Sequence, residues 1–198
     1  MGQYFTSKHR RLLNELGGSI FDLTAGICGQ ATYMQPILDR ILTVNLILST
    51  VIFYVAARIY VLPRLGQIRP KTILIPILLL HSLRHLGLMF LMRGAIYPGM
   101  PPEFAYPAAI GDFITALLAF TAMPAVAKDL LAGRTLVWIF NVFGTVDLIA
   151  AITLATLYNA PIYMGAAYWI SAFWVPALLV THYITFIVLT RYKLGASK

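Results

Sequence analysis

The chain has 198 residues, of which 60% are hydrophobic and only 11% are charged. A water-soluble domain of this size needs more polar side chains to cover its surface, so this class of protein is excluded. In a soluble protein the net charge of +8 would suggest a nucleic-acid partner. In a membrane protein it does not, because Lys and Arg collect at the cytoplasmic ends of helices.

The N-terminal residues 1–38 are predicted to form a region of their own. One interpretation is an amphipathic helix over residues 5–16 that lies at the membrane interface. The other is a sixth membrane crossing over residues 18–38, which contains Asp22 and Pro36 and would therefore need shielding by protein. Both interpretations stay open.

Residues 39–198 contain five apolar runs, each long enough to cross a bilayer at about 20 residues per helix. These runs cover residues 41–62, 72–92, 107–127, 136–158 and 168–190. They should be helices, since lipid offers no partners for free backbone groups and the alternating pattern of a membrane barrel is absent. The sequence predicts an all-α, polytopic helical bundle in the lipid bilayer, with five clear transmembrane helices.

The basic residues predict the orientation of this bundle. Nine fall on one side, namely Arg58, Arg64, Arg69, Lys71, Lys128, Arg134, Arg191, Lys193 and Lys198, and five on the other, namely Lys8, Arg10, Arg11, Arg40 and Arg93. The side with nine is expected to be cytoplasmic, which places the C-terminus inside and the loops 94–106 and 159–167 outside. Assembly into a homo-oligomer or a larger membrane complex is left open.

Three formal charges lie well inside the apolar runs: Arg84, Asp112 and Asp147. At the centre of a lone helix each would cost about 2.5 to 3.5 kcal/mol, so they should face the bundle interior and pair. The depths allow a pair between Arg84 and either aspartate. A purely structural ion pair that fixes helix register is the alternative to a functional role.

Further polar residues are expected near these charges. His81, Arg84, His85 and Leu88 follow α-helical i, i+3, i+4, i+7 spacing, which predicts one shared face. The fourth and fifth runs bring other polar side chains to similar depths. The predicted ligand-binding cavity is lined by Arg84, His85, Asp112, Asn141, Asp147 and His182. No catalytic residue is assigned, and whether the protein is an enzyme is left open.

The histidines raise the question of a cofactor. His81 and His85 are four residues apart, but the Glu that follows the first His in zinc proteases is missing, so no metal site is predicted. A b-type haem needs two imidazoles on different helices at similar depth, and His81 or His85 with His182 meets that condition. The cofactor stays unknown, with haem b as one alternative.

Four segments resemble a family of small bacterial inner-membrane proteins of unassigned function. These are residues 84–88 (RHLGL), 111–112 (GD), 140–148 (FNVFGTVDL) and 176–182 (PALLVTH). The resemblance implies a bacterial inner-membrane location and points to the same six residues as the predicted cavity. It implies no activity.

The leading hypothesis is a membrane protein that binds a small apolar or weakly polar molecule, for transport or proton-linked chemistry. In this hypothesis His85 and His182 exchange protons, while Arg84 pairs with an aspartate or binds an anion. One alternative is a redox protein with haem or quinone between the second and fifth helices. Another is an accessory subunit whose polar residues only hold helices together.

Overall fold

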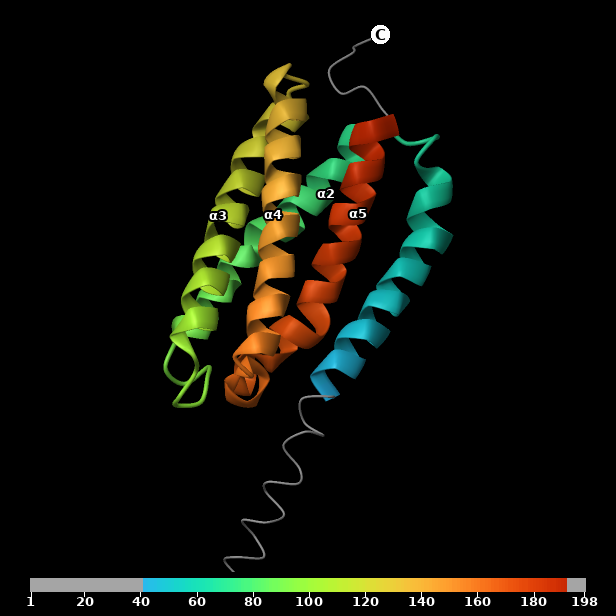
Figure 1. Cartoon of the computed structure of the whole chain (residues 1–198). Coiled ribbons are helices and arrows are strands. Elements are labelled where there is room, and N and C mark those ends of the chain that lie inside the picture. The colour runs from blue at the N-terminus through green and yellow to red at the C-terminus, as the bar shows by residue number, and fades with distance from the viewer. Residues whose placement is uncertain (1–40, 192–198) are drawn as a thin grey trace, which may run out of the picture. The chain divides into compact units, whose positions relative to one another are not determined.

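The computed structural model describes residues 41–191 of the chain (Figure 1). These residues form helices and no strand. The predicted N-terminal region 1–38, with both interpretations of it, lies outside the described residues.

Five helices are long and apolar enough to cross a membrane. They cover Ile41–Arg64, Pro70–Leu91, Pro102–Ala127, Ala132–Leu157 and Gly165–Arg191. Each coincides to within a few residues with one of the apolar runs of the sequence, so the predicted all-α bundle is confirmed.

Several spans are not uniform α-helices. The first is α-helical over residues 41–56 and ends in a π turn, η1 (Ala57–Val61), and a 3₁₀ turn, η2 (Leu62–Arg64). The second joins α2 (Pro70–Ser82) to a nine-residue 3₁₀ helix, η3 (Leu83–Leu91). The next two are α3 (Pro102–Ala127) and α4 (Ala132–Leu157). Two 3₁₀ turns, η4 (Ala160–Tyr163) and η5 (Gly165–Ala167), lead to the π turn η6 (Ile170–Trp174) and α5 (Val175–Arg191).

Helix α3 lies at the centre of the packing, in contact with α2, η3 and α4, while α5 packs against α4 and α2. The contact face of α3 contains many small residues. The hydrophobic effect does not drive helices together within a membrane, so small residues stabilise the contact by letting neighbouring backbones approach closely. The buried small residues of this face are Ala108, Ala109, Gly111, Ala116, Ala119 and Ala122.

The buried apolar residues form two clusters along the bundle. One, which includes Leu78, Val126 and Phe140, lies toward the end where α3 meets α4. We call this the basic end; it is at the top of Figure 1. The other cluster includes Phe90 and Phe104 and lies toward the 92–101 loop. Arg84 of η3, Asp112 of α3 and Asp147 of α4 each fall between residues of the two clusters in sequence, so these three charges occupy the middle of the bundle.

Polar contacts join helix ends at the basic end. Lys71 Nζ lies 2.6 Å from Asp129 Oδ2, at the surface. Arg134 Nη2 donates to the carbonyl of Leu189 at 3.1 Å, which satisfies one of the last free carbonyls of α5.

The orientation of the bundle can be tested by cysteine labelling in a Cys28→Ser background. A membrane-impermeant reagent added to the outside of intact cells or right-side-out vesicles should label Glu103→Cys and should label Gln67→Cys only after the membrane is opened, because the basic end is expected to be cytoplasmic. Both positions are exposed. The opposite labelling pattern would overturn the orientation.

Candidate functional site

The guanidinium of Arg84 lies at the centre of a buried polar cluster. Arg84 is 1% exposed. Its Nε donates to Asp112 Oδ1 at 2.7 Å and its Nη2 donates to Asp147 Oδ2 at 2.5 Å, while Nη2 also forms an ion pair with Asp112 Oδ1 at 2.6 Å. Its Nη1 donates to the carbonyl of Gly144 at 3.2 Å and lies 3.4 Å from His182 Nε2. The predicted pairing is therefore confirmed, with both aspartates rather than one.

The 3₁₀ helix η3 determines which side chains join Arg84. With three residues per turn, residues three apart lie on one face, and His81, Arg84, Gly87 and Phe90 are all buried. His85 is exposed, and its Nδ1 lies 3.0 Å from the carbonyl of Ser82. The expectation that His85 and Leu88 share the face of Arg84 is wrong, because it assumed α-helical spacing.

Three glycines make room for the polar side chains of neighbouring helices. A methyl group on Gly87 would overlap the carboxylate of Asp112, and one on Gly111 would overlap that of Asp147. A methyl group on Gly144 would lie 2.7 Å from His182 Cε1 and 2.8 Å from His182 Nε2. η3, α3 and α4 thus each provide a glycine against which the polar residue of the next helix packs.

His182 is oriented by Asn141. The His182 Nδ1 lies 2.7 Å from Asn141 Oδ1, and Asn141 Nδ2 donates to the His182 carbonyl at 3.3 Å. Since Arg84 has only donors, His182 Nε2 must accept and Nδ1 must carry the proton that is donated to Asn141. His182 therefore faces the second helix, as predicted, in its neutral Nδ1–H form.

His81 packs directly against His182, with ring centroids 4.3 Å apart. Its Nε2 lies 2.9 Å from Thr181 Oγ1, whose hydroxyl proton is directed to the carbonyls of Ala177 and Leu178. His81 Nε2 is therefore the donor, and its buried Nδ1 has no partner among the described residues.

These positions bear on the cofactor hypotheses. A haem between His81 and His182 does not fit, because the rings are in contact and leave no slot for a porphyrin. His81 and His85 are in no position to share a metal ion, since the first is fully buried and the second is exposed.

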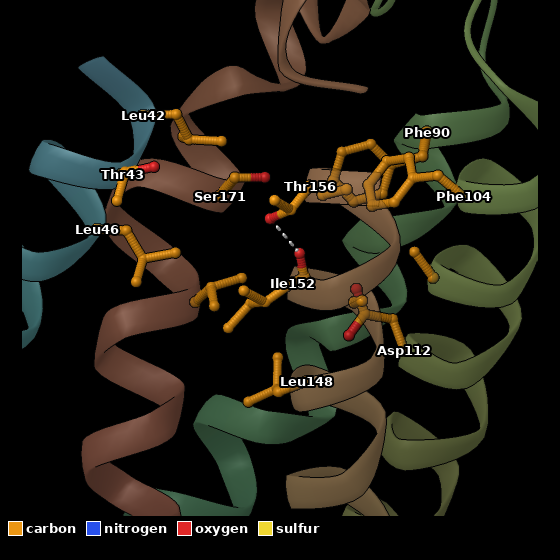
Figure 2. Close-up of a pocket in the computed structure, with 14 residues that line it drawn as sticks. Leu42, Thr43, Leu46, Phe90, Phe104, Asp112, Leu148, Ile152, Thr156 and Ser171 are labelled. Atoms are coloured by element: carbon orange, nitrogen blue, oxygen red, sulfur yellow. Dashed lines mark hydrogen bonds between the residues drawn. The ribbon is translucent and has the colours of Figure 1, made fainter. Parts of the chain in front are cut away.

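A cavity of about 130 Å³ lies beside the cluster (Figure 2). Its wall is mainly apolar, from Leu42, Leu46, Phe90, Phe104, Ala108, Leu148, Ala151, Ile152, Ala155 and Val175, with Thr43, Thr156 and Ser171. Asp112 provides the charge on this wall and joins the cavity to the Arg84 cluster. Of the six predicted site residues, Asp112 lines it; Arg84, Asn141, Asp147 and His182 lie in the cluster behind it.

A second, open hollow lies beside the 92–101 loop, and Phe90 lines both it and the cavity. The loop is tied to the rest of the bundle, because Tyr97 N–H donates to the Tyr163 carbonyl at 2.8 Å and Ala167 N–H donates to the Ala95 carbonyl at 3.1 Å. The ring of Phe90 therefore stands between the loop surface and the cavity.

Residues 41–190 match a domain of unknown function, DUF8737. The chain belongs to the DUF8737 family. This agrees with the resemblance to an uncharacterised family, and the matched range includes the whole Arg84 cluster. No curated protein and no solved structure matches the chain.

The electrostatic role of Arg84 in this DUF8737 protein can be measured by substitution. Arg84→Met leaves two carboxylates in the bundle without their donor and should destabilise the protein by about 3–5 kcal/mol. The triple variant Arg84→Met, Asp112→Asn, Asp147→Asn carries no unpaired charge and should be more stable than the single variant. Equilibrium unfolding in detergent measures both.

The matched control is Arg93→Met, which removes an exposed arginine and should change the stability little. A triple variant no more stable than Arg84→Met would contradict the ion-pair account.

The glycine contacts make a separate prediction. Gly111→Ala should destabilise the bundle by roughly 1–3 kcal/mol, since the added methyl group overlaps Asp147. In an Asp147→Ala background the same substitution should cost much less. Unfolding of the four proteins of this double-mutant cycle gives the coupling, and additive effects would show that Gly111 does not serve to accommodate Asp147.

Proposed function

We propose that this DUF8737 protein is a multi-pass protein of the bacterial inner membrane that binds a small apolar or weakly polar molecule in the cavity beside Asp112, for transport or proton-linked chemistry. The observation that carries the proposal is the position of Asp112, which lies in the wall of a mainly apolar cavity and contacts Arg84. Ligand sites commonly combine an apolar lining with a few fixed polar groups.

The size of the cavity limits the ligand. An engineered protein cavity of about 150 Å³ holds benzene, and this cavity measures about 130 Å³. The ligand is therefore of roughly benzene size, or a short part of a longer molecule.

Two further observations support transport from the loop side. Phe90 lines both the cavity and the hollow beside the 92–101 loop, so a rotation of its side chain would open a short path between them. The distribution of basic residues supports a cytoplasmic basic end and C-terminus, so this path would begin outside the cell membrane.

The proposal is tested by filling the cavity. Ala151 lines it, whereas its neighbour Ala150 is exposed. Ala151→Phe should weaken binding of n-butanol, a small and weakly polar probe, by at least about tenfold, or 1.4 kcal/mol. Saturation-transfer NMR on purified protein in lipid nanodiscs measures the binding.

Ala150→Phe is the matched control and should bind n-butanol like the unmodified protein. Equal binding by all three proteins would show that n-butanol partitions into lipid and not into the cavity, and would count against the proposal.

A further inference from the structure

We propose that the cavity selects small amines in their protonated, ammonium form. The inference rests on the proposed ligand site and names the class of molecule that the site takes: a molecule of about five to eight non-hydrogen atoms in all, with an apolar body and one ammonium group, sized by the comparison with benzene.

The formal charges of the Arg84 cluster do not balance. Arg84 supplies one positive charge to a cluster that contains two carboxylates, and His182 is neutral in its hydrogen-bonded form. The cluster thus carries a formal excess of one negative charge. The other Lys, Arg, Asp and Glu residues of the four helices are Lys71, Glu103, Arg134 and Arg191, all of which lie at or near helix ends. An uncompensated charge at this depth is costly, so a cationic ligand is favoured.

One of the two carboxylates, that of Asp112, lies at the cavity. The hydrogen bond from Arg84 Nε and the ion pair with Arg84 Nη2 both end on Asp112 Oδ1. Asp112 Oδ2 accepts no hydrogen bond from the described residues, and the side chain keeps 14% of its surface exposed. Since Asp112 lines the cavity, its carboxylate would attract an ammonium group there, whereas a carboxylate ligand would be repelled.

The rest of the cavity lining also suits an ammonium ligand. The hydroxyl protons of Thr156 and Ser171 are directed to the Ile152 carbonyl and to Met164 Sδ, so toward a ligand these two oxygens act as acceptors, which suits a ligand that carries donors. Phe90 and Phe104 pack edge to face, with centroids 5.1 Å apart, at the same cavity. Aromatic faces attract cations, and the alkyl wall suits the body of a short amine.

The experiment compares n-butylammonium with n-butanol, which has the same number of heavy atoms and no charge. At neutral pH butylamine is almost fully protonated, as lysine is. The unmodified protein in nanodiscs should bind n-butylammonium at least about tenfold more tightly than n-butanol. This comparison needs no variant, so it does not depend on how substitutions fold.

Asp112→Asn removes the excess charge and keeps the shape of the side chain. It should abolish the preference for n-butylammonium over n-butanol. Asp129→Asn is the matched control, because Asp129 is an exposed carboxylate paired with Lys71 at the basic end, and it should keep the full preference.

The outcomes separate the two proposals. Equal binding of both probes, or tighter binding of n-butanol, overturns the ammonium class and leaves the cavity site standing; it would mean that a proton neutralises the cluster instead. Binding of neither probe overturns both. A preference that persists in Asp112→Asn overturns the role of Asp112 in selecting the charge.

Discussion

The buried guanidinium of Arg84 determines how four of the five spans are arranged. Its N–H groups are directed to four acceptors, namely Asp112 Oδ1, Asp147 Oδ2, the Gly144 carbonyl and His182 Nε2, and it forms ion pairs with both aspartates. These acceptors come from α3, α4 and α5, so one side chain of η3 joins the other three helices. Burying Arg84 without such partners would cost a large free energy. The packing that supplies them therefore requires η3, α3, α4 and α5 to meet at the depth of Arg84.

The close approach of the helices follows from the same requirement. Aspartate is short, and its carboxylate reaches Arg84 only if the neighbouring backbone is near. Glycine at positions 87, 111 and 144 removes the methyl groups that would prevent this approach. The polar cluster and the small residues of α3 thus both depend on close approach of the helix backbones. This close contact stabilises the bundle in place of the hydrophobic effect, which membrane helices lack.

Much of this arrangement could be predicted from the sequence. The five spans follow from the length and apolarity of the runs, and the contact of Arg84 with aspartate follows from the cost of burying a lone charge. The position of His85 could not be predicted, because a 3₁₀ helix of nine residues is rare and changes which residues share a face. The cavity lining could not be predicted either, since Leu46 or Ile152 would look the same in sequence if it faced lipid.

The two sides of the cavity differ in how firmly they are held. Asp112 is fixed by Arg84, within the four helices that share the charged cluster. Leu42 and Leu46 belong to the first helix, which is the least buried of the five spans and contacts its neighbours through pairs such as Asn45 with Tyr168 and Phe53 with Phe173. Segments with few buried contacts open at lower free energy than the core. The wall formed by the first helix is therefore expected to open at lower free energy than the wall that contains Asp112, so movement of the first helix would change the size of the cavity while the carboxylate stays in place.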